Sequence, residues 1–222
     1  MKLPISARLL ACANYVNRND RIADVGCDHG YLSIHLLTGG IVRSAIASDV
    51  NEQPLLSAVR NAEKYGVRDR MEFYLSDGVQ SIPRDFDTMI CAGMGADTMI
   101  SILDAAPWLK DARYRLILQC QSRRPALRRR LSDEGYLIRR EDLVRDGKFI
   151  YTVMEVIYAP GTVLTPSQCF ISPALLESGS PLLAEYRDRV IHGLRLTLDG
   201  LSRTGDPRQE EYERILRELK TP

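Results

Sequence analysis

The sequence predicts an α/β fold: a mostly parallel sheet covered by helices on both faces, closed by an antiparallel hairpin strand and followed by a helical pair. From residue 21 to residue 133, short apolar β runs alternate with helical patterns, which is typical of βαβ units. Two further β runs over 136–159 are joined at Asp146-Gly147, a strong hairpin signal. Two segments over 181–203 and 204–220 then repeat apolar residues at steps of three and four, as amphipathic helices do.

Helices and strands alternate in the N-terminal part. The expected elements are a helix over 4–16, a strand over 21–26, a helix over 31–40, a strand over 43–50 and a helix over 51–66. Asn51 can cap the last of these helices, Pro54 lies in its first turn and Gly66 lies past its end. This is the order of two βα units after an N-terminal helix.

The same alternation continues to the hairpin. The expected elements are strands over 70–78 and 86–95, a helix over 96–105, a strand over 114–120 and a helix over 123–134. The 222 residues are enough for one good-sized core plus an appendage, since most domains hold roughly 100–200 residues.

After Pro160 the alternation of strands and helices ends, and no further strand is expected. A loop-rich connector with helical pieces precedes the two amphipathic helices, which are joined by a short Gly-Asp-Pro turn. Asp206 is expected to cap the second helix and Pro207 to open it. We therefore expect a domain over 1–160 and an antiparallel helical domain over 161–222.

The composition is that of an ordinary globular protein. Of 222 residues, 45% are hydrophobic and 27% are charged, and no apolar run reaches the ~18 residues of a membrane span. The five cysteines are scattered, without a CxxC pair, which favours reduced thiols and a cytoplasmic location over disulfides or a metal site.

The net charge is only +1, but arginines cluster between 123 and 140. Two interpretations stay open for this cluster: a solvated helix face or a phosphate-binding patch. Its members are Arg123, Arg124, Arg128, Arg129, Arg130, Arg139 and Arg140.

The turn after the first strand suggests a ligand. Gly26 and Gly30 flank it, so a ligand can approach the backbone closely, yet the spacing is not that of the dinucleotide motif GxGxxG. Asp28 inside the turn would repel a pyrophosphate and suits a cation. S-adenosylmethionine carries a sulfonium and an ammonium, so the turn favours it over NAD.

The following strand ends carry further polar groups. Asp49 ends the second strand 23 positions after Gly26, near the ~20 expected for an acid that binds ribose hydroxyls. Asp77 at the third strand end is placed for an adenine amino group, and Ala92-Gly93-Met94-Gly95 ends the fourth. In an open α/β sheet, ligands bind beyond the carboxyl ends of the strands. A sheet that ends in an antiparallel hairpin strand is also typical of methyltransferases.

Four motifs carry a family resemblance: ADVGCDHGYL, DTMICAGMG, RLILQ and DGKFIYTVMEV. In order and spacing over residues 3–158 they resemble the bacterial tRNA (adenine(22)-N1)-methyltransferase family. The resemblance implies a Rossmann-like class I methyltransferase sheet, S-adenosyl-L-methionine as cofactor, and transfer of a methyl group to N1 of an adenine in tRNA. Matched motif residues include Arg8, Asp28-His29, Gly93-Met94-Gly95 and Gln119.

The candidate site residues follow from the strand ends and the resemblance. Asp28, Arg8 and His29 are the catalytic candidates, with Asp28 favouring the positive charge that develops on the methylated base. The expected cofactor-binding residues are Asp24, Gly26, Asp28, Gly30, Tyr31, Asp49, Val50, Asp77, Gly78, Ala92, Gly93, Met94 and Gly95. The expected RNA-binding residues are Arg8, Arg123, Arg124, Arg128, Arg129 and Arg130.

Other candidates have competing interpretations. Cys27 and Cys91 are expected to be small buried spacers, since methyl transfer to nitrogen needs no thiol. His35 and His192 have no partners that would complete a triad or a metal set. Two alternatives to the tRNA enzyme stay open: a methyltransferase for another RNA or a small molecule, and an inactive RNA- or protein-binding module. No metal and no membrane are expected as partners.

Overall fold

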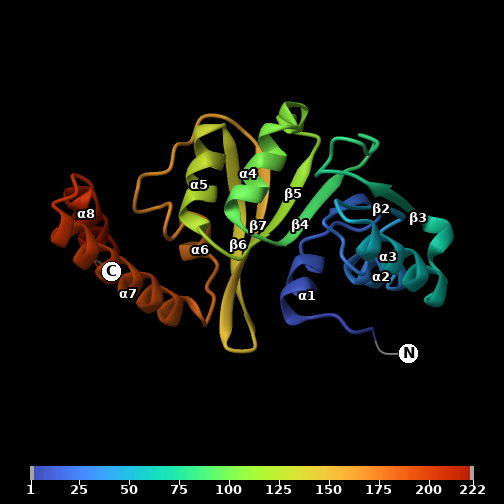
Figure 1. The fold of residues 1–222 in the computed structure, drawn as a ribbon, viewed down its shortest axis with the longest axis horizontal. Helices are drawn as coiled ribbons and strands as arrows, with labels where there is room; N and C mark the ends of the chain where they lie inside the picture. Colours follow the sequence, from blue (N-terminus) through green and yellow to red (C-terminus); the bar gives the residue numbers. More distant parts are fainter. Residues whose placement is uncertain (1–2, 221–222) are drawn as a thin grey trace.

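The computed structural model describes residues 3–220 and contains a seven-stranded sheet in the order β3-β2-β1-β4-β5-β7-β6 (Figure 1). The strands are β1 (Arg21–Val25), β2 (Ser44–Asp49), β3 (Met71–Leu75), β4 (Thr88–Met94), β5 (Arg115–Cys120), β6 (Tyr136–Asp146) and β7 (Phe149–Tyr158). The helices are α1 (Ala7–Ala13), α2 (Tyr31–Thr38), α3 (Glu52–Lys64), α4 (Ala96–Asp104), α5 (Arg124–Asp133), α6 (Pro173–Glu177), α7 (Leu183–Thr204) and α8 (Gln209–Lys220), with short 3-10 turns at Arg68–Arg70 and Pro107–Leu109.

The first five strands are parallel, so their carboxyl ends share one edge. Val25 pairs with Ser48 of β2 and with Cys91 of β4, and Asp49 pairs with Leu75 of β3. The strand ends that the sequence marks with aspartate and glycine therefore meet, because parallel strands in register end together.

Two apolar layers hold the helices on the sheet. α1, α2 and α3 pack on one face through residues such as Leu36, and α4 and α5 pack on the other through residues such as Leu127. The inner strands β1 and β5 are buried on both faces, which explains their continuous apolar runs. The predicted parallel sheet with a helical layer on each face is confirmed.

The hairpin is the antiparallel part of the sheet, as predicted. β7 pairs with β5 only over Met154–Ile157, so residues 149–153 of β7 pair with β6 alone. The hairpin thus extends past the carboxyl edge of the parallel strands, and Figure 1 shows its turn projecting beyond the sheet next to α1. It forms a wall on one side of that edge.

The connector after residue 160 is fixed to α5 and β6 by a buried ion pair. The Arg128 guanidinium donates to both carboxylate oxygens of Glu141, at 3.2 and 2.5 Å, and to the main-chain oxygens of Cys169 and Phe170. Ser172 also donates to Glu141 and accepts from Leu175 N at the start of α6. The division into domains at residue 160 stays a prediction, since this network crosses it.

The helical pair α7–α8 is confirmed, with one difference at its turn. The second helix begins at Gln209 rather than at Pro207, and the Asp206 carboxylate accepts from Arg208 N at 2.9 Å. The start of α7 packs on the hairpin through Tyr186, which lies with Leu143 and Ile150 in a small apolar cluster. No helix within residues 3–220 is long and apolar enough to cross a membrane.

Candidate active site

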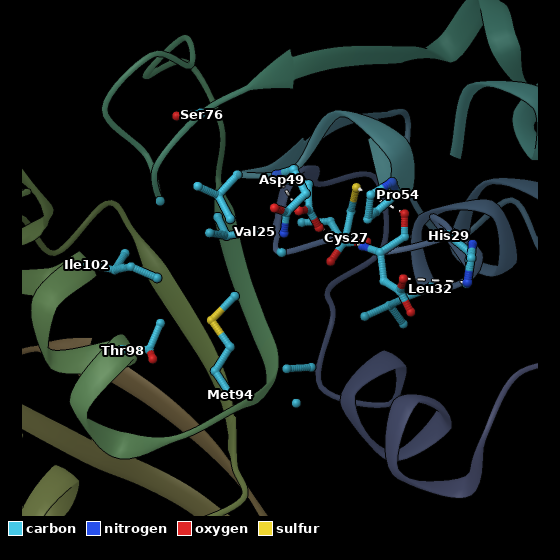
Figure 2. A pocket seen from close by; sticks show the side chains of 18 of the residues that line it. Val25, Cys27, His29, Leu32, Asp49, Pro54, Ser76, Met94, Thr98 and Ile102 are labelled. Carbon is cyan, nitrogen blue, oxygen red and sulfur yellow. Dashed lines mark hydrogen bonds and ion pairs between the residues drawn. The ribbon is translucent and has the colours of Figure 1, made fainter. Parts of the chain in front are cut away.

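A cavity of about 440 Å³ lies at the carboxyl edge of the parallel strands. Its walls come from α1, the β1–α2 turn, the ends of β2 and β3, and the β4–α4 turn. Figure 2 shows Asp49 and Cys27 on one side of the cavity and Thr98 and Ile102 on the other, with Met94 between them.

The β1–α2 turn is built from left-handed residues. Gly26, Asp28 and Gly30 have φ angles of 69°, 50° and 72°. The amides of Gly26 and Cys27 both donate to Ser48 O, which ties the turn to β2. Asp28 takes a left-handed conformation that residues other than Gly, Asn and Asp seldom adopt, and its side chain is exposed.

Gly30 has a packing role. A Cβ at Gly30 would lie 3.0 Å from the Cβ of Ala58, so the glycine lets the start of α2 approach α3. Gly30 does not line the cavity, and neither does Gly95, where a Cβ would lie 2.9 Å from Ser122 Oγ. These two expected cofactor-binding residues therefore pack beside the cavity and do not line it.

The Asp49 carboxylate is held rigidly at the cavity wall. One oxygen accepts from Asp28 N at 3.2 Å and the other from Asn51 N at 2.9 Å. Each carboxylate oxygen has a second acceptor position, so Asp49 can also receive two hydroxyl donors from a ligand. This arrangement fits the vicinal hydroxyls of a ribose.

Asp24 lies at the cavity floor and is 4% exposed. Burial raises the pKa of its carboxyl from 3.8 to about 6, and the nearby Asp49 charge adds to this effect. The hydrogen bond from Ser33 Oγ, at 2.8 Å, opposes it. A carboxylate that is costly to ionise is stabilised by a bound cation.

A β-bulge forms the other end of the cavity. The β4–β5 register shifts between Ala92 and Met94, which leaves Gly93 as the extra residue at φ 85°. A Cβ at Gly93 would lie 3.0 Å from Arg8 Nη1, so the glycine lets the arginine approach the backbone. Bulges of this kind commonly reorient side chains near active sites.

Arg8 reaches this bulge from α1. Its Nη1 donates to Gln119 Oε1 at 3.1 Å, and its main-chain N donates to Asp146 of the hairpin at 3.5 Å. Because a guanidinium only donates, the Gln119 oxygen must face Arg8. The buried Gln119 Nε2 then has no partner within residues 3–220.

Asp28 and His29 lie at the cavity mouth. Their side chains are 72% and 50% exposed, and His29 Nε2 lies 3.5 Å from Asp28 Oδ1. Tyr31 lines the cavity, its ring centroid 5.9 Å from that of His29. The three expected catalytic residues thus border one cavity, with Arg8 coming from a different element.

Several lining residues were missed by the sequence analysis. They are Leu9, Val25, Leu32, Asn51, Pro54, Ser76, Thr98 and Ile102. Most of them are one or two positions from a predicted site residue in the sequence. Thr98 and Ile102 lie on α4, and predicting them would have required knowing which face of that helix lies against the cavity. Cys27 and Cys91 are buried as expected, and burial raises the pKa of both thiols, so they stay neutral.

The five arginines of the cluster that were expected to contact RNA divide into three kinds. Arg128 is 0% exposed in its pair with Glu141, so its predicted contact with RNA is wrong: its guanidinium is used inside the fold. Arg123, Arg129 and Arg130 are partly exposed and pair with carboxylates. Arg124 forms no ion pair within residues 3–220 and lies over the Tyr186 ring at 5.5 Å. RNA contacts at these four and at Arg8 stay a prediction.

Within the described residues, no group of three or more His, Cys, Asp or Glu side chains is arranged to hold a metal ion. The groups gathered at the sheet edge are instead carboxylates, glycines and one arginine.

Comparisons with known proteins agree with this geometry. A family model described as a methyltransferase domain matches residues 5–154. The tRNA (adenine(22)-N(1))-methyltransferase of Bacillus subtilis is 34% identical over 149 residues, which is 66% of this chain and 63% of that protein. The chain therefore aligns with less than two thirds of that relative.

Two solved structures share nearly the whole fold. A Streptococcus agalactiae protein of the NADB-Rossmann superfamily is 27% identical, with a TM-score of 0.88, covering 99% of this chain and 97% of that chain. A Streptococcus pneumoniae protein, described as a candidate tRNA (m1A22) methyltransferase in complex with S-adenosyl-L-methionine, is 29% identical. Its TM-score is 0.84, covering 97% of this chain and 99% of that one.

Proposed function

This chain belongs to the methyltransferase-domain family, and from that membership and its acidic cavity we propose that it methylates N1 of an adenine in tRNA with S-adenosyl-L-methionine. The observation that carries the proposal is the lining of the cavity: four aspartates, with Asp49 fixed by two main-chain amides. The tRNA substrate is supported by the Bacillus subtilis and Streptococcus pneumoniae relatives.

The residues fit this methyl donor. When bound, S-adenosyl-L-methionine supplies an electrophilic methyl group on a sulfonium. Asp49 accepts the ribose hydroxyls, Asp77 accepts the adenine amino group and Asp24 faces the cationic end. The carboxylates thus match the charge and the donor groups of the ligand.

Adenine N1 carries a lone pair at neutral pH, so the chain needs no base to create the nucleophile. The N1 lone pair forms the new bond to the methyl carbon while the carbon–sulfur bond breaks. The task of the site is therefore alignment, which can lower a barrier by about 7–11 kcal/mol. Arg8, Gly93 and Met94 border the end of the cavity where the base would enter.

Methylation leaves a positive charge on the base until its amino group loses a proton. Asp28 at the cavity mouth is placed to stabilise this charge. N1 lies on the Watson–Crick edge, so the target adenosine must be unpaired or flipped out of its helix.

The test is nucleoside analysis of a tRNA transcript that carries adenine at position 22, after incubation with the purified chain and S-adenosyl-L-methionine. We expect one 1-methyladenosine per transcript and none when guanine replaces that adenine. Absence of 1-methyladenosine in the adenine transcript, from protein that binds the cofactor, would refute the proposal.

A further inference from the structure

A second concave surface begins beside the active-site cavity. It consists of two adjoining cavities, of about 240 and 270 Å³, between the extended hairpin, the first turn of α5 and α7. They share Arg124, Tyr186, Arg189 and Val190, and we call them together the hairpin groove. Figure 1 shows α7 beginning beside the projecting hairpin and running away from the sheet towards α8.

The hairpin groove adjoins the active site through Gln121. Gln121 lines its near end, and Gln121 N donates to the main-chain oxygen of Met94, which lines the active-site cavity. Gln121 Nε2 also lies 3.6 Å from the position of a Cβ on Gly93. A polymer with one unit in the cavity would have its next units at this groove.

The charges of the two concave surfaces are opposite. Four aspartates line the active-site cavity, whereas no lining residue of the hairpin groove has a carboxylate. Arg124 has no carboxylate partner within residues 3–220, and the Arg189 side chain is 47% exposed although it pairs with Glu185. The groove thus suits an anionic ligand, and the cavity suits a cationic one.

The groove also presents flat apolar rings. Phe149 is 52% exposed, and its ring centroid lies 6.0 Å from that of Tyr151 on the same strand. Exposed rings next to arginines are the arrangement on which single-stranded nucleic acids stack their bases while phosphates contact the cations.

We propose that the hairpin groove binds unpaired nucleotides adjoining the target adenosine, with bases on Phe149 and Tyr151 and phosphates on Arg124 and Arg189. This inference rests on the proposed RNA substrate and adds the path of the strand. It explains why the hairpin extends past β5, because the extension carries both rings to the edge where the adenosine enters.

The test compares matched double variants. Arg124→Gln/Tyr151→Leu and Arg189→Gln/Phe149→Leu each remove one arginine and one ring from the groove. Arg60→Gln/Tyr65→Leu removes one arginine from α3 and one ring from the residue that follows this helix, at the opposite end of the sheet (Figure 1). Fluorescence anisotropy gives the Kd for an unmodified tRNA transcript at several salt concentrations, and calorimetry gives the Kd for S-adenosyl-L-methionine.

We expect each groove variant to bind the transcript at least tenfold more weakly, with a salt slope lower by about 0.7 for each phosphate that the variant no longer neutralises. The control variant should stay within twofold of the unmodified chain, and cofactor affinity should be unchanged in all three. Groove variants that bind tRNA as tightly as the control would overturn the proposal.

A second measurement is independent of the variants. Photo-crosslinking of the natural chain to a transcript with 4-thiouridine beside the target adenosine should label peptides that contain Tyr151 or Arg189. Labelling only outside the groove would overturn the assignment. If the chain binds tRNA without forming 1-methyladenosine, the proposed reaction fails while these two measurements still decide the groove.

Discussion

Single residues at the strand ends set the charge of the active site. Asp24, Asp49 and Asp77 lie at or just past the carboxyl ends of three different strands, and they line one cavity because parallel strands end at a common edge. Their surroundings differ: Asp24 is buried, Asp49 is held by amides, and Asp77 is exposed. Predictions about these residues concern ligand affinity more than the fold.

Asp49→Ala should weaken S-adenosyl-L-methionine binding by about 2–3 kcal/mol, roughly 30- to 150-fold in Kd by calorimetry. The substitution removes two hydroxyl acceptors and also frees the amides of Asp28 and Asn51. Asp97→Asn on α4, outside the cavity lining, is the control and should leave the Kd unchanged. An unaltered Kd in Asp49→Ala would exclude the ribose role.

The raised pKa of Asp24 predicts a pH dependence of binding. The ligand cation needs ionised Asp24, so its affinity should fall as the pH decreases through about 6, by up to tenfold per unit. Calorimetry from pH 5 to 8 measures this decrease. In Asp24→Asn the affinity should be low and lack this pH-dependent step; a step of the same size in the variant would assign it to another group.

The same shift has a defined sign for stability without ligand. Because the pKa of Asp24 is higher in the folded chain than in the unfolded chain, protonation of Asp24 stabilises the fold. This stabilisation is fully present below about pH 4 and is lost as the pH rises through about 6. A shift of about two units corresponds to roughly 3 kcal/mol for this buried group. Urea unfolding at pH 8 should therefore find Asp24→Asn more stable than the natural chain.

At the scale of elements, one arginine of α5 is buried and links this helix to two other segments of the chain. Arg128 joins α5, β6 and the connector before α6, and both members of its pair with Glu141 are fully buried. The neighbouring Arg129 and Arg130 face outward. Successive residues of a helix point in different directions, so a run of consecutive arginines cannot all be buried on one face.

Removing one partner of this pair should be costly. Arg128→Leu leaves the Glu141 carboxylate buried without its cation, so we expect a loss of about 3–5 kcal/mol in urea unfolding. Arg130→Leu removes exposed ion pairs that solvent screens, so it is the matched control and should leave the free energy of unfolding nearly unchanged. The double variant Arg128→Leu/Glu141→Leu should be more stable than Arg128→Leu alone. A loss below about 1 kcal/mol in Arg128→Leu would contradict a structural role.

At the scale of the whole molecule, charge is segregated although the net charge is close to zero. Carboxylates gather at the edge of the parallel strands, and arginines with aromatic rings gather where the hairpin, α5 and α7 meet. A methyl donor with a positive charge and a polyanionic acceptor would thus bind next to each other, each on a surface of opposite sign.

Local patterns in the sequence were sufficient for the order of strands and helices, the hairpin and the aspartates of the cavity, since strand ends and turns depend on neighbouring residues. The folded chain alone decided that Arg128 is buried, that Gly30 serves helix packing, and that Thr98 and Ile102 reach the cavity. It also decided that Phe149 and Tyr151 share a groove with Arg189, some forty residues away in the chain. The physical reason is that burial and long-range contacts depend on which surfaces pack together. A periodic apolar pattern shows that one face of a helix or strand is buried, but it does not specify the element that packs against that face.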